Sequence, residues 1–133
     1  MCVSGIGIDT VELKKARRFL TISPVRLRRF FSEEELTYAF SHRGLCVERL
    51  AARFAAKEAF YKALMTAYPK GRMSLLTMSE HVSVSLTEQG APELSIAWHQ
   101  LPWIKDDHVY TLLSMTHTET QATAIVILGK KEC

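Results

Sequence analysis

The stretch "LAARFAAKEAFYKAL", residues 50–64, governs how the rest of the sequence is interpreted. Its apolar residues recur every three or four positions, which predicts a long amphipathic helix with a wide apolar side. At about 100° per residue, Lys57 falls inside that apolar arc, and Arg53 and Glu58 lie at or within its margins. A charged side chain on the buried side of a helix needs a partner or a ligand. The stretch therefore predicts the longest helix of the chain, with a partner or a ligand for Lys57 on its buried side.

Two interpretations of these charges follow from geometry alone. In the first, Lys57 extends to solvent, and Glu58 forms an exposed pair with Lys62 that is worth about 0.3–0.5 kcal/mol. In the second, the charges bind a ligand together with Asp9, which follows the glycine-containing segment 2–8. Two carboxylates suit a hard cation such as Mg²⁺, and neighbouring lysine or arginine side chains suit phosphate. A simple N-cap role for Asp9 is equally compatible with its position.

The first thirty residues predict a strand followed by a helix. Residues 2–8, "CVSGIGI", read as a short buried strand. Asp9 and Glu12 resemble a capping box, so we expect a helix through residues 11–20, "VELKKARRFL". The Ser-Pro pair at 23–24 ends that helix.

Two more helices are expected in the middle of the chain. Ser32 and Glu35 have capping-box spacing, which starts a helix there that ends near Gly44. The helix quoted above then continues to about Thr66, before a loop marked by the proline and glycine at 69–71.

Beyond the third helix the apolar residues alternate, which is typical of strands. Four segments show this pattern: 81–88, 92–98, 109–115 and 121–128. The turn residues "EQGAP" between the first two predict a hairpin. A strand, then helices, then a run of strands indicates a single α+β domain over residues 1–133, with helices on one face of a largely antiparallel sheet.

Composition excludes several classes of protein. The chain is 47% hydrophobic and 23% charged, as in ordinary globular domains, and no apolar run approaches the roughly 18 residues of a membrane span. Cys2, Cys46 and Cys133 are widely spaced, so we expect reduced cysteines and neither a disulfide framework nor a zinc site. The start of the chain has no signal-peptide pattern, and we expect a cytoplasmic protein.

Positive charge is concentrated in one segment. Although the net charge is only +3, residues 14–29 contain seven basic residues and no acid. The seven are Lys14, Lys15, Arg17, Arg18, Arg26, Arg28 and Arg29. We call residues 14–29 the basic segment. Nucleic-acid binding is a poor interpretation, because aromatic interleaving and known RNA or DNA motifs are absent. An acidic protein partner and a solvated basic face are the remaining alternatives.

Three stretches together resemble a known family. "GIGIDTVELKKA" (5–16), "ARFAAKEAFYKAL" (52–64) and "SMTHTETQATAIVI" (114–127) are similar to the signature regions of holo-acyl-carrier-protein synthases, which are 4′-phosphopantetheinyl transferases. "EQGAPEL" (88–94) resembles the G-K-P hairpin of the family, with Ala91 in place of the lysine. The resemblance runs in order over most of the chain. It implies the phosphopantetheinyl transferase fold.

The resemblance also implies roles for individual residues. Asp9 and Glu58 match the two Mg²⁺-binding carboxylates, with Glu58 as the base, directly or through a metal-bound water. Lys62 matches the catalytic lysine that contacts the transferring phosphate. The positions implied to bind coenzyme A are Arg53, Lys57, Lys62, Thr66, His117 and Thr118. By the same resemblance Lys57 points toward a ligand, and the carrier-protein-binding residues are Lys14, Lys15, Arg17, Arg18, Arg26 and Arg28.

The reaction implied by the resemblance is the transfer of 4′-phosphopantetheine from coenzyme A to a serine of an acyl carrier protein. It releases adenosine 3′,5′-bisphosphate. The resemblance further implies a homotrimer with each active site at a subunit interface. The sequence departs from the family just after the helix, where the family's G-T-G is replaced by Met65, Thr66 and Ala67. Because those glycines allow close ligand approach, the alternative is a catalytically weak relative that binds carrier protein or coenzyme A without efficient transfer.

Overall fold

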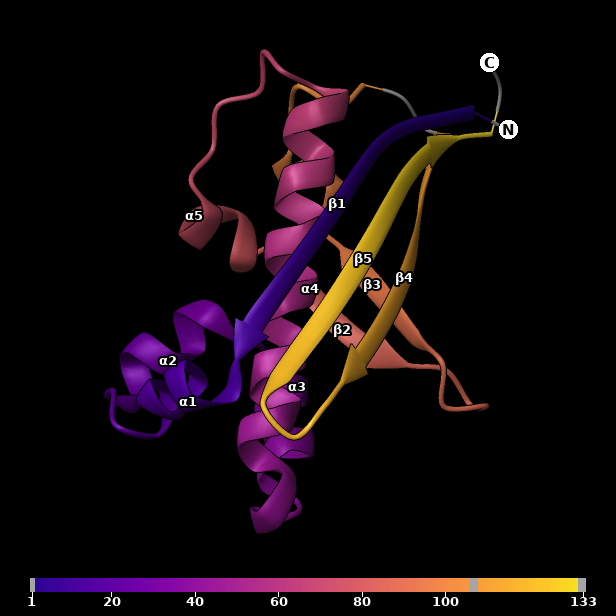
Figure 1. Cartoon of the computed structure of the whole chain (residues 1–133). Coiled ribbons are helices and arrows are strands. Elements are labelled where there is room, and N and C mark those ends of the chain that lie inside the picture. Colours follow the sequence, from indigo (N-terminus) through magenta and orange to yellow (C-terminus); the bar gives the residue numbers. More distant parts are fainter. Residues whose placement is uncertain (1, 106–107, 132–133) are drawn as a thin grey trace.

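The structure, a computed structural model, describes residues 2–105 and 108–131. Helix α4 (Cys46–Ala67) runs through the middle of the molecule and packs against the three-stranded sheet β1–β5–β4 (Figure 1). In chain order the elements are β1 (Cys2–Glu12), α1 (Leu13–Ala16), η1 (Arg17–Leu20), α2 (Pro24–Phe30), α3 (Glu33–Phe40), η2 (Arg43–Leu45), α4, α5 (Leu75–Ser79), β2 (Val82–Leu86), β3 (Pro92–Ile96), η3 (Trp98–Gln100), β4 (Val109–His117) and β5 (Gln121–Lys130).

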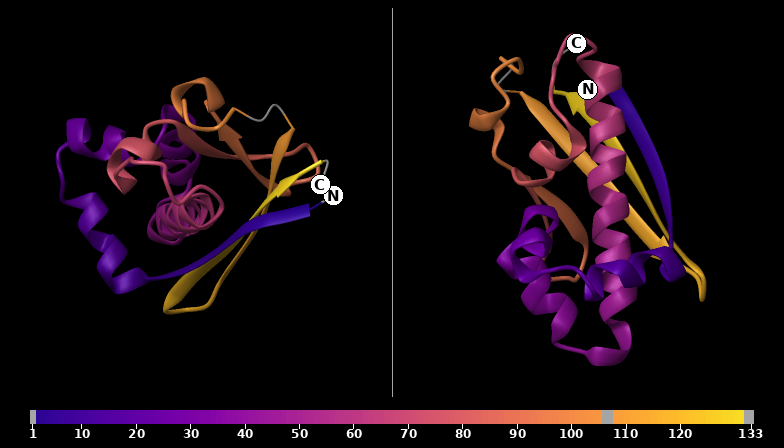
Figure 2. Two further views of the ribbon diagram at one scale, coloured as in Figure 1. Left: turned by 90° about the horizontal axis from the view of Figure 1, so that it is seen from above. Right: turned by 90° about the vertical axis from the view of Figure 1, so that its left-hand side faces the viewer.

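The layers are arranged around α4. The three-stranded sheet lies along one side of the helix, while the short helices and the β2–β3 hairpin lie along its other sides (Figure 2). One core cluster lies between α4, the sheet and the hairpin, and a second lies between the N-terminal half of α4 and α1–α3. The predicted α+β class is confirmed, but the strands form two separate antiparallel sheets rather than one.

Strand β1 packs against α4 with backbone nearly touching backbone. A Cβ atom at Gly7 would overlap the carbonyl of Ala59, and one at Gly5 would overlap the carbonyl of Ala63. Small residues on both partners permit this approach. Since alternate residues of a strand share a face, Asp9 points toward α4 in the same way as Gly5 and Gly7.

The predicted helix start at Asp9 is wrong. Strand β1 continues through Asp9 to Glu12 and pairs with β5, so that Asp9 lies opposite Ala124. The helix begins only at Leu13, whose N–H donates to Thr120 O at 2.9 Å. Cross-strand pairing has overridden the local capping signal, so Asp9 is not an N-cap.

Ser23 and Pro24, which are predicted to end one helix, also begin the next one, α2. Ser23 Oγ accepts from the N–H of Arg26, and Pro24 occupies the first turn of α2, where its missing N–H costs nothing. The sequence interpretation missed α2, and it missed α5, which Ser74 caps by accepting from Thr77. Both helices are short, so periodicity gave little signal.

Several local predictions are confirmed. Both bonds of the Ser32–Glu35 capping box are present, at 3.2 and 2.8 Å. Helix α4 spans the predicted stretch and continues through Met65 to Ala67. The β2–β3 hairpin forms over the predicted turn, where Gly90 has a φ of 83°. That left-handed conformation favours glycine.

The described residues include two of the three cysteines, Cys2 and Cys46. Cys46 is free and buried, as predicted, and burial raises the pKa of its thiol. Cys2 is disulfide-bonded, so the prediction that all three cysteines are reduced is wrong for this residue, and Cys133 lies outside the described residues. Within residues 2–105 and 108–131, no helix has the length and apolar character that crossing a membrane requires.

The contact between β1 and α4 gives a stability prediction. Gly7→Ala places a methyl group where the Ala59 carbonyl lies, so we expect a loss of roughly 3 kcal/mol or more in the free energy of unfolding. Gly44→Ala is the matched control, because its Cβ would only reach ordinary contact with His42 at 3.4 Å. Urea unfolding followed by circular dichroism measures both; equal stability of the two variants would contradict the close approach.

Candidate active site

Asp9, Glu58 and Lys62 come together where β1 crosses α4. Lys62 Nζ lies 3.1 Å from Asp9 Oδ1 and donates to the carbonyl of Ile8 at 3.0 Å. The Asp9 side chain is only 10% exposed, whereas that of Lys62 is 54% exposed. Lys62 therefore pairs with Asp9 across the two elements, and not with Glu58 along the helix.

The two carboxylates of this site are close enough to interact strongly. Burial, followed by a side-chain hydrogen bond with Asp9 and then the charge of that carboxylate, raises the pKa of Glu58 to about 7, against an opposing effect of Lys62 and Arg18. The second oxygen of Asp9, Oδ2, is buried and accepts no hydrogen bond within the described part of the chain. A proton or a cation between the two carboxylates would relieve their repulsion. Arg18 of the basic segment is thus near enough to act on the pKa of Glu58.

These carboxylates are the residues that could hold a metal ion. Among the described residues there is no cluster of three or more His, Cys, Asp or Glu that could do so alone. A pair of carboxylates suits Mg²⁺, which commonly takes its other ligands from water and substrate phosphates. The buried, unpartnered Oδ2 of Asp9 fits this chemistry.

A second polar group surrounds a cavity of about 270 Å³ on the β4 side of α4. Arg53 and His117 line this cavity, as do two residues that the sequence interpretation missed, Tyr38 and Arg49. The guanidinium groups of Arg49 and Arg53 stack on the Tyr38 ring at 4.0 and 4.3 Å. His117 Nε2 lies 3.6 Å from Glu48 Oε2. The cavity therefore gathers positive charge around an aromatic ring.

Arg53 is the most constrained member of this group. It is 4% exposed, and burial lowers the pKa of its guanidinium. Its Nη1 donates to Arg49 O at 3.3 Å, while Nε is buried and has no partner in the described structure. A buried arginine with an unused donor beside a cavity is suited to an anionic ligand.

The two threonines named from the sequence have local roles. Thr66 Oγ1 donates to Lys62 O at 2.9 Å, one turn back along α4. Thr118 Oγ1 accepts from the N–H groups of Thr120 and Gln121 and so shapes the turn between β4 and β5. Thr66 lies near the carboxylate site and Thr118 next to His117.

The predicted orientation of Lys57 is wrong. Its side chain is 0% exposed, and Nζ lies 2.7 Å from Glu35 Oε1. It neither extends to solvent nor points toward a ligand, because it is paired in the interior with Glu35 of α3. The capping-box spacing predicts the capping role of Glu35 but not this second contact. We therefore remove Lys57 from the coenzyme-binding set.

The basic segment presents its charges on the surface. Lys14, Lys15, Arg17, Arg18, Arg26 and Arg28 are all exposed, on α1, η1 and α2. Arg28 pairs with Glu33 at 2.8 Å. Two apolar side chains lie among these charges, since Leu20 is 49% and Val25 72% exposed. The surface is therefore basic and partly apolar.

Comparison with known proteins identifies the family. Residues 5–126 match the 4′-phosphopantetheinyl transferase superfamily. The chain belongs to this superfamily. A holo-[acyl-carrier-protein] synthase of Treponema denticola is 36% identical over 127 residues, which are 95% of this chain and 98% of that protein. The resemblance seen in the three motifs thus extends to nearly the whole sequence.

Solved structures of 4′-phosphopantetheinyl transferases share the fold. An ACPS–CoA complex of Chronobacterium ammoniagenes superimposes with a TM-score of 0.81 at 25% identity and covers 96% of this chain and 98% of its own. A Bacillus anthracis holo-(acyl-carrier-protein) synthase in complex with CoA (3′,5′-ADP) gives a TM-score of 0.74 at 30% identity, covering 98% and 100%. The chain therefore has the full phosphopantetheinyl transferase fold.

The raised pKa of Glu58 predicts a pH-dependent stability. Protonation of Glu58 contributes its full stabilisation of the folded state below about pH 4.5, the ordinary pKa of a glutamate in the unfolded chain. This stabilisation is lost as the pH rises through about 7, the pKa of Glu58 in the folded protein. We expect the free energy of unfolding of Glu58→Gln to fall less than that of the wild type over this range, in urea titrations with a chelator present. Glu12→Gln, at the exposed end of β1, is the control; identical profiles for all three proteins would contradict the prediction.

Proposed function

We propose that the chain transfers 4′-phosphopantetheine from coenzyme A to a serine hydroxyl of an apo acyl carrier protein and releases adenosine 3′,5′-bisphosphate. The observation that carries this proposal is the meeting of Asp9, Glu58 and Lys62 at the crossing of β1 and α4. Carboxylates that can hold a cation, a base and a lysine are the groups that phosphoryl transfer requires.

The side chains have separate tasks in this reaction. Glu58 accepts the proton of the serine hydroxyl, directly or through a water. Its pKa of about 7 belongs to the site without a cation, and a cation held by Asp9 and Glu58 would lower it and keep the carboxylate ionised, the form that a base requires. The serine oxygen then forms a bond to the β-phosphorus of coenzyme A, while the bond from that phosphorus to the oxygen bridging to the α-phosphate breaks. Lys62, whose side chain is half exposed beside Asp9, neutralises negative charge on the phosphate oxygens.

Asp9 and Glu58 are the proposed ligands of Mg²⁺. The buried Oδ2 of Asp9 and the repulsion that raises the pKa of Glu58 support this assignment. When bound, Mg²⁺ supplies charge neutralisation at the pyrophosphate. With only these two carboxylates from the chain, the ion would take its other ligands from the phosphates and water.

The nucleotide end of coenzyme A is proposed to bind in the cavity lined by Arg53 and His117. Arg53 and Glu58 are five residues apart on α4 and so point about 140° from each other. Asp9 approaches the helix from β1, whereas His117 and Met115 approach it from β4, two strands away. The helix stands between the two groups. We therefore propose that one coenzyme A molecule contacts Asp9 and Glu58 of one subunit and Arg53 and His117 of another.

This geometry and the resemblance support the proposal of a homotrimer with shared active sites. The sheet β1–β5–β4 has an outer face that α4 does not cover, and apolar side chains are exposed on it: Ile6 by 55%, Ile8 by 59% and Leu112 by 53%. Ile6 and Leu112 both lie opposite Ile127 in the sheet register. Contiguous exposed apolar side chains on a sheet are typical of an interface, and we propose that other copies of the chain cover them.

The basic segment is proposed to dock the acyl carrier protein. Carrier proteins of this type are strongly acidic, and Arg17 and Arg18 are exposed next to the apolar Leu20. Arg18 is also close enough to Glu58 to lower its pKa, which supports a docking surface beside the proposed base. Complementary charge mainly accelerates encounter and selects the partner.

We also propose that the reaction takes place in the cytoplasm. Coenzyme A is a large polyanion that does not diffuse through membranes, so an enzyme that consumes it works in the compartment that contains it. The disulfide at Cys2 is unusual for such a compartment. Mass spectrometry of protein alkylated during lysis determines whether Cys2 is oxidised in the cell.

Glu58→Ala should abolish transfer. With coenzyme A, Mg²⁺ and apo carrier protein, we expect the wild type to add one phosphopantetheine, and the variant to react on the order of 10²–10⁴-fold more slowly. The mass of the carrier protein measures this, Glu12→Ala controls for loss of a carboxylate, and a chelator should remove the wild-type activity. No transfer by the wild type, with carrier protein still bound, would instead indicate the catalytically weak relative, in which Met65 and Ala67 restrict the coenzyme site.

Charge reversal at Arg17 and Arg18 should weaken carrier-protein binding. We expect the double variant to glutamate to raise the Kd for apo carrier protein at least about tenfold at low salt, and to leave the Kd for coenzyme A unchanged. Reversal of Lys70 and Arg72, which are exposed outside the basic segment, is the matched control. Calorimetric titration separates the two ligands; equal loss for both would argue against docking at the basic segment.

Mixed subunits should recover activity if the site is shared. Glu58→Ala and the double variant Arg53→Gln/His117→Ala are each expected to be impaired, the first in chemistry and the second in coenzyme A binding. Equimolar co-refolding of the two variants should restore roughly a quarter of the sites. A restored site needs Glu58 from a subunit of the double variant and Arg53 with His117 from a Glu58→Ala subunit, and each of these has a probability of about one half. Absence of recovery in verified mixed trimers would place both groups in one subunit.

A further inference from the structure

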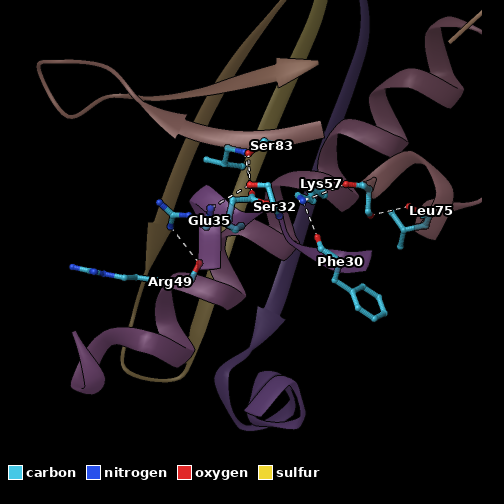
Figure 3. A network of polar contacts seen from close by, with 10 residues as sticks. Phe30, Ser32, Glu35, Arg49, Lys57, Leu75 and Ser83 are labelled. Carbon is cyan, nitrogen blue, oxygen red and sulfur yellow. Dashed lines mark hydrogen bonds and ion pairs between the residues drawn. The ribbon is translucent and has the colours of Figure 1, made fainter. Parts of the chain in front are cut away.

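Lys57 and Glu35 form an ion pair that is sealed in the interior. Both side chains are 0% exposed, and Lys57 Nζ lies 2.7 Å from Glu35 Oε1. The ammonium also donates to the carbonyl oxygens of Phe30 at 2.7 Å and Ser79 at 3.4 Å (Figure 3). Burial lowers the pKa of Lys57, and Glu35 opposes this shift. All three hydrogens of the ammonium therefore have acceptors.

The carboxylate of Glu35 is equally well satisfied. Oε1 accepts from the N–H of Ser32 at 2.8 Å, and Oε2 accepts from the N–H of Val84 at 2.9 Å. Ser32 Oγ lies 2.7 Å from Ser83 Oγ, which adds a second link to β2 (Figure 3). A buried pair with every polar atom bonded fixes the geometry of the segments that supply those atoms.

Three helix ends converge on this pair. Phe30 and Ser79 are the last residues of α2 and α5, and Glu35 lies in the first turn of α3. Cations are favourable at helix C-termini and anions at N-termini, so each charge has the sign that the adjacent helix ends prefer. Lys57 is thus a common anchor for α2 and α5 on the helix that carries the active site.

The anchor joins the α2 part of the proposed docking surface to the helix that carries the proposed base. Lys57 and Glu58 are consecutive residues of α4, and their side chains point to different sides of the helix. Lys57 holds the C-terminal end of α2, whose exposed face carries Arg26 and Arg28, while Glu58 faces Asp9. The aromatic contacts of Phe30 with Phe54 and Phe19 hold the same end of α2 by packing.

We propose that Lys57 is a positioning residue for the carrier protein: its bond to the end of α2 sets the placement of Arg26 and Arg28, the α2 part of the basic segment, relative to Glu58. This inference rests on the proposed function, in which the basic segment docks the carrier protein. A serine delivered by a displaced carrier protein would miss the reacting phosphate, whereas coenzyme A, bound through other side chains, would be unaffected.

The test uses the full chain with Lys57→Met and Glu35→Gln combined. This variant removes both charges at nearly constant volume, so it avoids an unpaired buried charge, which would destabilise the Lys57→Met single variant more. We expect the KM for apo carrier protein to rise about tenfold, with an unchanged Kd for coenzyme A. Leu101→Ala is the control for loss of stability alone, because Leu101 is buried in the other core cluster; its carrier-protein KM should not change.

Hydrogen exchange gives a readout that does not depend on activity. The double variant should exchange faster at the amides of residues 27–31, at the end of α2, and unchanged at those of residues 58–64 in α4. Unaltered exchange in α2 with an unaltered carrier-protein KM would overturn the positioning role, and so would equal weakening of coenzyme A and carrier-protein binding. A wild-type protein without transferase activity would refute the proposed function, while the exchange measurement would still decide whether Lys57 holds α2.

Discussion

The close approach of β1 to α4 is the constraint on which the rest of the structure depends. Gly5 and Gly7 leave room for the carbonyls of Ala59 and Ala63, so strand and helix pack with almost no side chain between them. Two residues further along the strand, Asp9 is thereby brought to Lys62 at 3.1 Å and into interaction with Glu58. A side chain at either glycine would push the elements apart, and the carboxylates would separate with them.

The four sides of helix α4 contact four different parts of the molecule. One side receives Asp9 from β1, and another forms the cavity with Arg53 and His117. A third packs into the apolar core through residues such as Phe60, and a fourth carries Lys57 to the ends of α2 and α5. This division explains why 12 of the 22 residues of the helix are buried although it contains several charges. In the proposed function, two of these sides supply the two halves of the coenzyme A site.

The charges at the candidate active site differ from the structural ones in how well their atoms are hydrogen-bonded. The Lys57–Glu35 pair is sealed from solvent, and its atoms are all hydrogen-bonded, which fixes its surroundings. At the Asp9–Glu58 pair, by contrast, one carboxylate oxygen has no partner in the described structure, and the pKa of Glu58 rises to about 7. Incomplete satisfaction of buried charges is typical of sites that bind a ligand.

The sequence by itself determined the elements whose signals are local: the Ser32–Glu35 capping box, the long α4 helix and the hairpin turn at Gly90. The resemblance of its motifs also selected Asp9, Glu58 and Lys62, three side chains that the structure brings together. Tertiary structure decided the rest. Pairing with β5 kept Asp9 in a strand instead of a helix cap, and Glu35, 22 positions before Lys57 in the chain, gave that lysine its buried partner. Neither outcome is encoded locally, since both depend on which distant backbone and side-chain groups the packing brings together.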